Sequence, residues 1–295
     1  YQKKELFDLK PIIEKLKNDY PDTKAVTDAT RKPSVAEMAK ATEKLGKFIT
    51  VRKDGKGDFK SIQAAINSAP PSSLIEIQDS GTYEEVLVIN KKVTLRGKKG
   101  AWPIITDRKL ANLPAKRALV WVLASAVTVE RVVMVARHGC LCARCPSLLV
   151  RRALLLSEKP TLARTDVWLD ANTRARFEQC VTTSLGTSGG HIALQDCLVL
   201  SYVCSEGEFV AWNSVIAAHV GSRSSLCVLR SCTVRESVSL SVGHNVIVDC
   251  IVGGVVPHNK ATAVVEHTDA FGPKGFIALP KAGRGCFSKD PQFRD

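Results

Sequence analysis

The segment Leu194-Gln-Asp-Cys197-Leu-Val199 contains the pattern that decides the fold: an apolar anchor followed, three positions later, by a small residue. The same pair recurs seven times along the chain, and successive anchors lie 21, 27, 17, 17, 18 and 18 residues apart. The pairs are Val129/Val132, Val150/Ala153, Phe177/Cys180, Leu194/Cys197, Ala211/Ser214, Leu229/Cys232 and Ile247/Cys250. Near-equivalent units of this length are typical of a solenoid in which each unit buries one apolar stripe against the next.

Apolar residues alternate around the anchors, as in Val127 and Val129, or Cys197 and Val199. A period of two is the signature of short strands with one buried face. A bend at Glu130-Arg131 and at Gln195-Asp196 resets the phase, so that the anchor and the small residue both point inward. Units of 17 or 18 residues with one stripe are too short for helical hairpin repeats. The pattern therefore predicts an all-β fold, a right-handed parallel β-helix whose coils are roughly 4.8 Å apart.

Three other regions complete the predicted organisation. Residues 1–47 form a helical extension or linker, because Leu6, Leu9, Ile13 and Leu16 share one helical face. Residues 48–295 form the β-helix, with an amphipathic helix near 60–69 that covers its open first coil. A tail from about residue 257, rich in Gly, Pro and Lys, wraps the last coil.

The chain has 295 residues and a formal charge of +13, which favours anionic partners such as acidic polysaccharide, nucleic acid or a membrane surface. The alternative is a basic protein whose charges are simply solvated, since no block of five like charges concentrates the field. The sequence contains no recognition-helix, zinc-finger or RNA-binding pattern, so nucleic acid ranks below glycan. No apolar run reaches the roughly 18 to 20 residues of a membrane span.

The chain contains ten cysteines, and four of them occupy the small inward position of the repeat, where cysteine acts as a small apolar residue. A separate group, Cys140, Cys142 and Cys145, has a spacing that could begin a zinc or redox site with His138. The competing interpretation is a cysteine-rich turn between coils. Because no matching fourth ligand follows in the sequence, we predict neither a metal site nor a cofactor.

The stretch Asp54-Gly-Lys-Gly-Asp-Phe-Lys-Ser-Ile-Gln-Ala-Ala-Ile-Asn-Ser-Ala-Pro70, followed by Gly81-Thr-Tyr83-Glu-Glu85, resembles the opening of pectinesterases and related pectin-lyase-like β-helix proteins. The resemblance implies a β-helix fold and a location outside the cytoplasm. Gln195-Asp196-Cys197-Leu198 is similar to the first catalytic aspartate motif of that family, so Asp196 and Gln195 are the catalytic candidates.

The second aspartate motif of the family has no good counterpart in this chain. Glu208-Phe-Val210 is slightly similar to it, but Glu208 follows Asp196 by 12 residues, less than one coil. We therefore expect the two carboxylates on different faces, where they cannot act together as acid and nucleophile. No segment supplies the arginine of the family, and esterase activity by the family mechanism is not expected.

The opening and the ending Lys289-Asp-Pro-Gln-Phe-Arg-Asp295 also resemble β-helix regions of large bacterial proteins, some of them appended to receptor-like serine/threonine kinases. The chain contains no kinase glycine loop, H-R-D or D-F-G motif. Any kinase activity would belong to further domains upstream.

Arginines recur at the bends. The repeat aligns Glu130 with Arg151 and Glu178, which predicts a solvent-exposed ladder of ion pairs worth under about 1 kcal/mol each. The functional alternative is a basic strip that binds the carboxylates of a polyanionic glycan, since guanidinium groups grip carboxylates at two points. The residues of this predicted strip are Arg131, Arg152, Arg137 and Arg144.

Three functions follow from these observations. The first is a non-catalytic β-helix module that contacts carbohydrate, most simply an acidic polysaccharide. The second is a carbohydrate-active esterase or lyase of pectinesterase-like type that uses Asp196 in an unfamiliar arrangement. The third is a structural or sensor domain of a larger receptor-like serine/threonine kinase.

Overall fold

A computed structural model describes residues 46–110, 118–158, 166–223, 226–241, 243–257, 261–276 and 286. The predicted helical extension lies outside these residues except for its last two positions. The tail after residue 276 lies outside them too, apart from Cys286, and so does the ending 289–295.

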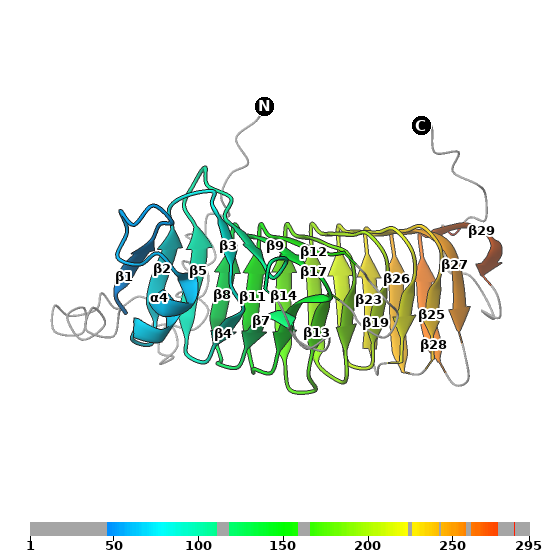
Figure 1. Cartoon of the computed structure of the whole chain (residues 1–295). Helices are drawn as coiled ribbons and strands as arrows, with labels where there is room; N and C mark the ends of the chain where they lie inside the picture. The colour runs from blue at the N-terminus through cyan, green and yellow to red at the C-terminus, as the bar shows by residue number, and fades with distance from the viewer. Residues whose placement is uncertain are drawn as a thin grey trace, which may run out of the picture. The chain divides into compact units, whose positions relative to one another are not determined.

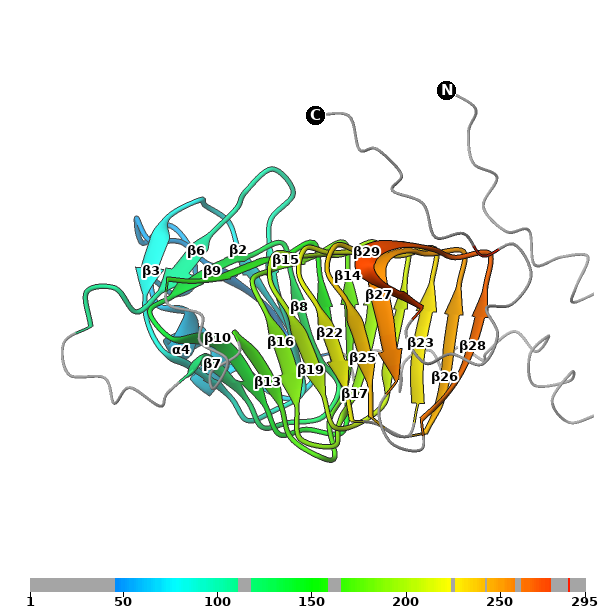
Figure 2. The same cartoon turned by 90° about the vertical axis from the view of Figure 1, so that its right-hand side faces the viewer.

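The described chain is a stack of coils, each built from three short strands that pair in parallel with the strands of the next coil (Figures 1 and 2). One strand of each coil joins an 11-stranded sheet, here called sheet A. Its strands, in order, are β1 (Phe48–Val51), β2 (Ser73–Ile77), β5 (Val93–Gly97), β8 (Val127–Glu130), β11 (Leu148–Arg151), β14 (Arg174–Glu178), β17 (His191–Gln195), β20 (Phe209–Trp212), β23 (Leu226–Arg230), β26 (His244–Val248) and β28 (Thr262–Glu266).

The other two strands of each coil form two parallel runs of an 18-stranded sheet, here called sheet B. The first run is β3 (Thr82–Glu84), β6 (Ile104–Thr106), β9 (Val133–Ala136), β12 (Leu154–Ser157), β15 (Val181–Thr182), β18 (Leu198–Val199), β21 (Val215–Ile216) and β24 (Thr233–Val234). The second run is β4 (Leu87–Ile89), β7 (Ala118–Val122), β10 (Gly139–Ala143), β13 (Val167–Leu169), β16 (Leu185–Thr187), β19 (Val203–Ser205), β22 (Val220–Ser222) and β25 (Val238–Leu240). Both runs pair with β27 (Ile251–Pro257), which pairs in turn with β29 (Asp269–Phe276).

All seven predicted anchors lie in one column of sheet A. The pairing aligns Val129 with Val150, Phe177, Leu194, Ala211, Leu229 and Ile247. Every anchor is buried, and the small residue three positions later is buried beside it. The prediction of an all-β parallel β-helix is confirmed.

The predicted bend is a single residue in the left-handed conformation. In each of these coils one residue after the sheet A strand has a φ near +50°, which turns the chain sharply between two strands. These residues form a column that we call the turn edge: Arg131, Arg152, Gln179, Asp196, Asn213, Ser231, Asp249 and His267. Beneath it lies an inward column of small or short side chains: Val132, Ala153, Cys180, Cys197, Ser214, Cys232, Cys250 and Thr268.

Helix α4 (Ile62–Ser68) lies at the first coils and contacts β1, β2 and β4 (Figure 1). Ser61 caps it by accepting a hydrogen bond from the backbone N–H of Ala64 at 3.1 Å, and Ile62, Ala65 and Ile66 are buried. The sequence placed a helix at this position, within the stretch that resembles pectinesterases.

Glu85 holds the start of α4 against the coil below it. Its carboxylate accepts hydrogen bonds from the backbone N–H groups of Ile62 and Gln63 at 3.1 and 2.9 Å, and from the Ser61 hydroxyl at 2.8 Å. A carboxylate at a helix start also interacts favourably with the partial positive charge there.

We expect Glu85→Ala to destabilise α4 by about 1–2 kcal/mol, because three donors lose their acceptor. Amide hydrogen exchange of residues 62–68 measures the effect, and the exchange of sheet A strands distant from α4 serves as the internal reference. Glu84→Ala is the matched control, since Glu84 pairs instead with Lys109 at 3.0 Å. Equal protection of α4 in both variants would contradict the role given to Glu85.

Within the described residues, no helix combines the length and the apolar character that a membrane crossing requires.

Candidate functional site

The two catalytic candidates, Gln195 and Asp196, point to different surfaces. Gln195 ends β17, and its side-chain oxygen accepts a hydrogen bond from Arg176 at 2.7 Å on the outer face of sheet A. Asp196 belongs to the turn edge and accepts a hydrogen bond from the Asn213 side chain. Adjacent residues therefore serve two separate surfaces.

Asp196 borders a shallow hollow of about 380 Å³ on the turn edge, and the other described residues that line it carry no carboxylate. Asp196 comes just after β17 ends, whereas Glu208 comes just before β20 begins, and the pairing of Ile192 with Phe209 aligns the two strands. The two carboxylates therefore lie at opposite edges of sheet A, separated by the length of four strand residues, roughly 13 Å. The geometry agrees with the expectation that Asp196 and Glu208 do not face one substrate bond.

Arg131 and Arg152 lie in neighbouring coils of the turn edge, but both are already engaged. Arg131 is 3.1 Å from Glu130 and donates to the Gly97 carbonyl at 2.9 Å. Arg152 donates to the Gln179 side chain at 3.1 Å. Their hydrogen-bonding capacity toward an external carboxylate is thus reduced.

Arg137 and Arg144 lie at other corners of the coil. Arg137 follows β9 and donates to the backbone carbonyls of Arg108 and Leu110. Arg144 follows β10 and pairs with Asp170 at 2.6 Å. The structure therefore does not bring the four predicted arginines together in one strip.

The expected solvent-exposed ladder of Glu130, Arg151 and Glu178 is also wrong in two respects. Glu130 is only 4% exposed, and it pairs with Arg151 at 3.0 Å. Glu178 pairs with Arg176 of its own strand at 2.6 Å instead. Arg176 lies two residues before Glu178 on the same strand and binds its carboxylate in place of Arg151. The spacing of the coils alone did not predict this pairing.

The outer face of sheet A carries two adjoining hollows that share Val210, and we call them together the sheet A trough. Their volumes are about 420 and 610 Å³. The outward residues that line the trough are Leu149, Arg174, Arg176, Glu178, His191, Ala193, Glu208, Val210, Trp212, Val228 and Arg230. The middle column of the trough holds Leu149, Arg176, Ala193, Val210 and Val228, so it is apolar except for Arg176. The other charged or aromatic side chains line its rims.

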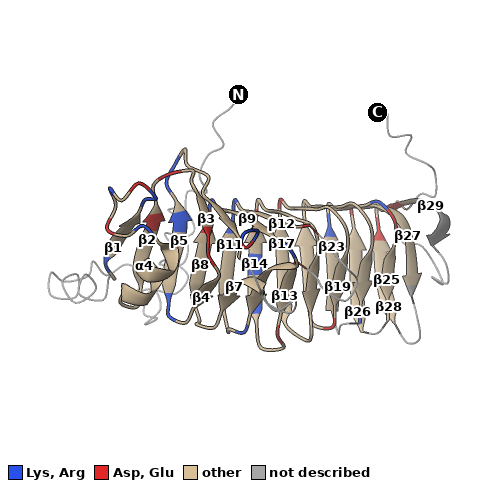
Figure 3. Ribbon diagram, viewed as in Figure 1, with Lys and Arg blue, Asp and Glu red and all other residues tan. Residues whose placement is uncertain are grey.

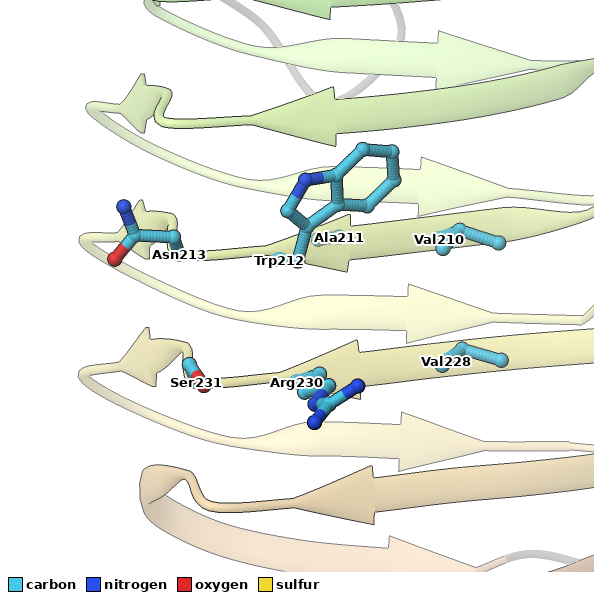
Figure 4. Close-up of a pocket in the computed structure, with 7 residues that line it drawn as sticks. All are labelled: Val210, Ala211, Trp212, Asn213, Val228, Arg230 and Ser231. Carbon is cyan, nitrogen blue, oxygen red and sulfur yellow. The ribbon is translucent and has the colours of Figure 1, made fainter. Parts of the chain in front are cut away.

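Arg176 fixes the only tryptophan of the trough. Its guanidinium lies 5.5 Å from the centre of the Trp212 ring while its nitrogens bind Glu178 and Gln195. A cation held over the ring face restrains the indole. Trp212 and Arg230 sit side by side on neighbouring strands, with Val210 and Val228 beside them (Figure 4).

Arg174 and Arg230 are the unengaged arginines of the trough. Both are exposed, and neither guanidinium has an ion-pair partner in the part of the chain that the structure describes. They lie on β14 and β23, and both of these sheet A strands carry blue segments, the colour of Lys and Arg, in Figure 3. Three coil steps separate the two strands, roughly 14 Å along the solenoid.

His191 and Glu208 form a pair on the rim of the trough that is nearer to Arg174. The His191 Nδ1 atom is 2.7 Å from the Glu208 carboxylate, and both side chains are partly exposed. The sequence interpretation missed this pair because residues 17 apart in the chain meet only once the coils are stacked in register.

The three cysteines of the group at 140–145 are buried. The Cys140 thiol donates to the Leu156 carbonyl at 3.0 Å, and burial raises the pKa of Cys140 well above its ordinary value. Among the described residues, no three His, Cys, Asp or Glu side chains gather in the way a metal ion requires.

No protein-family model matches the chain, and no curated protein matches it significantly. The solved structures that match include pectin methylesterase PemA from Erwinia chrysanthemi, at 14% identity over 80% of this chain and 92% of that one, with a TM-score of 0.45. A pectin methylesterase mutant in complex with a hexasaccharide matches at 12% identity over 80% and 92% of the two chains, with a TM-score of 0.45. The deglycosylated enzyme from Aspergillus niger matches at 14% identity over 82% and 84%, with a TM-score of 0.33.

The fold is that of the parallel β-helix proteins. This conclusion stands on the strand pairing of the chain itself. The matching structures belong to the family that the opening of the chain resembles, but likeness at this level says nothing about a site.

Proposed function

We propose that the chain is a non-catalytic β-helix module that binds an acidic polysaccharide along the sheet A trough. The observation that carries the proposal is the combination of a restrained indole with two unengaged guanidinium groups over an apolar floor. Indole faces pack against the apolar faces of sugar rings, and guanidinium groups bind carboxylates in two-point geometry. A formal charge of +13 favours the approach of a polyanion.

The trough also fits an extended ligand better than a compact one. Its two hollows follow one another across successive coils, with Arg174 and Arg230 in different hollows. A repeating polyanion can present a carboxylate to each arginine at once, and the second contact then benefits from a high effective concentration. We therefore expect short oligomers to bind much more weakly than the polymer.

Retention on immobilised polygalacturonate, compared with a neutral polysaccharide and with DNA as competitor, tests the proposal. We expect selective retention that DNA does not abolish, and a loss of affinity of about tenfold or more for the double variant Arg174→Gln/Arg230→Gln, since each charge-assisted hydrogen bond contributes roughly 1.5–3 kcal/mol. Trp212→Ala should weaken binding at all salt concentrations, because dissolved salt screens charge interactions but not the packing of the indole against a sugar ring.

Two controls separate this surface from the alternatives. Lys99→Gln removes one exposed positive charge in a turn outside the trough and should leave retention unchanged. Arg152→Gln removes a charge from the predicted turn-edge strip. Loss of retention in Arg152→Gln together with full retention in the double variant would assign binding to the turn edge instead of the trough. If DNA abolished retention as well as the polysaccharide does, retention would be explained by the diffuse positive charge of the protein alone.

A carbohydrate-active enzyme is the second candidate, and the His191–Glu208 pair favours it. A carboxylate that orients an imidazole is the usual arrangement of a general base, and the pair borders the 420 Å³ hollow beside Arg174. Methanol release from methylated pectin, or chain cleavage of polygalacturonate, would establish this function. Loss of that activity in His191→Ala would place it in the trough, and loss in Asp196→Asn would place it at the turn edge.

The third function, a sensor domain of a receptor-like kinase, remains a prediction from short sequence resemblances, one of which lies outside the described residues.

A further inference from the structure

Two cysteines on neighbouring coils meet directly beneath the turn edge. Cys180 and Cys197 precede β15 and β18, whose residues Val181 and Leu198 pair in register. Each thiol is held by the backbone carbonyl two residues earlier, at 3.3 Å for Cys180 and 3.2 Å for Cys197. Equivalent anchoring on successive coils places the two thiols in corresponding positions of stacked coils.

The spacing of the coils suits a covalent bond between these sulfurs. Paired strands lie roughly 4.8 Å apart, and the Cα atoms of disulfide-bonded cysteines are usually about 4.4–6.8 Å apart. The carbonyl anchors already direct both side chains along the same path. Bond formation therefore requires a small movement of two thiols rather than a rearrangement of the coils.

The pair differs chemically from an inert buried thiol. The neighbouring Cys197 thiol and burial raise the pKa of Cys180, whereas the neighbouring Cys180 thiol lowers the pKa of Cys197. Cys197 is thus the better nucleophile of the two, and Cys180 lies ready to resolve the product.

The two cysteines also border open space. Cys180 and Cys197 belong to the residues that line the 380 Å³ hollow, with Gln179, Asp196 and Asn213 around it. Cys180 and Cys197 are only 2% and 4% exposed, so that only a small reagent reaches the sulfurs.

We propose that Cys180 and Cys197 form an oxidisable dithiol site that a small peroxide converts into a disulfide linking two coils. The Cys197 thiolate attacks one peroxide oxygen, the O–O bond breaks, and the product is a sulfenic acid and hydroxide. The Cys180 thiol then attacks the sulfenic sulfur, the S–O bond breaks, and water leaves. The hydroxide takes up the proton that Cys197 lost on forming the thiolate. With hydrogen peroxide, two thiols are in sum oxidised by two electrons, one peroxide is reduced, and two waters form.

The test exposes the folded full chain to hydrogen peroxide at a dose that oxidises the exposed Cys204, then blocks the remaining thiols and maps the peptides by mass spectrometry. We expect a peptide pair joined through Cys180 and Cys197, which a thiol reductant separates. Absence of this pair at that dose would overturn the proposal, as would its formation only after unfolding in urea.

Substitutions provide matched controls that the chain itself shows to be tolerated. Ser214 occupies the same inward position one coil further on, where its hydroxyl accepts a hydrogen bond from the Cys197 backbone N–H at 3.1 Å. Serine therefore fits this column. Cys197→Ser should abolish the linkage, whereas Cys250→Ser, which alters the similar pair Cys232 and Cys250, should leave it intact. A linked product that persists in Cys197→Ser would assign the reaction to other thiols.

Discussion

Replacing Gly207 with alanine is expected to lower the melting temperature by roughly 6–12 °C, the result of about 3 kcal/mol of strain in a domain of this size. A Cβ atom at Gly207 would lie 1.8 Å from the carbonyl oxygen of Gly190 in the preceding coil. The backbone of Gly207 fixes the position of this Cβ atom, and the oxygen belongs to the backbone of Gly190, so neither atom moves without separating two coils. Thermal unfolding followed by far-ultraviolet circular dichroism measures the effect.

Gly221→Ala is the matched control for this experiment. A Cβ atom at Gly221 meets only the Val203 carbonyl oxygen, at 3.8 Å, an ordinary contact. We therefore expect a change within about 0.5 kcal/mol for this variant. Similar melting temperatures for both variants would show that the coils at Gly207 separate more easily than their packing indicates.

Asp166→Asn is expected to stabilise the protein by about 1–2 kcal/mol near neutral pH, because it removes a buried charge and supplies a missing donor. Asp166 is fully buried, and one of its oxygens accepts a hydrogen bond from the Ser184 backbone N–H at 3.0 Å. The other oxygen and the nearby Ser157 hydroxyl are both buried without a hydrogen-bond partner of good geometry. An asparagine amide at this place can donate to Ser157 while its oxygen keeps the bond from Ser184.

The pH dependence gives the prediction a second readout. Burial raises the pKa of Asp166, although the polar groups of Ser157, Thr183 and Ser184 around the carboxyl act in the opposite direction. A folded-state pKa above the unfolded value means that the group favours folding at low pH, and that this contribution is lost as pH rises through the folded-state pKa. The difference in stability between Asp166→Asn and the parent should therefore be largest at neutral pH and shrink toward pH ~4.

Asp249→Asn serves as the control for Asp166→Asn, since Asp249 is exposed on the turn edge. Melting temperatures of both variants from pH 4 to 8 complete the comparison. A destabilised Asp166→Asn at pH 7 would show that the ionised carboxylate has partners that stabilise it.

The sequence alone determined the β-helix, the column of seven anchors and the inward cysteines, because each depends on a local pattern repeated at a nearly constant interval. Val129 and Ile247 are separated by 118 residues, yet a repeat of this kind places them in one column without any knowledge of the fold. The bend at Asp196 could be predicted for the same reason, since it recurs after each sheet A strand from β8 to β28.

The proposed binding surface could be recognised only from the tertiary structure. Arg131, Arg137, Arg144 and Arg152 are all basic in the sequence, and only their contacts show that each is already bound within the protein. The restraint of Trp212 by Arg176 likewise depends on side chains from three stacked strands. Likewise His191 and Glu208 meet because the coils stack in register, which fixes distances between residues of different coils. Local patterns determine which way a side chain points, whereas the partner it finds is decided by neighbours that only the stacked coils bring together.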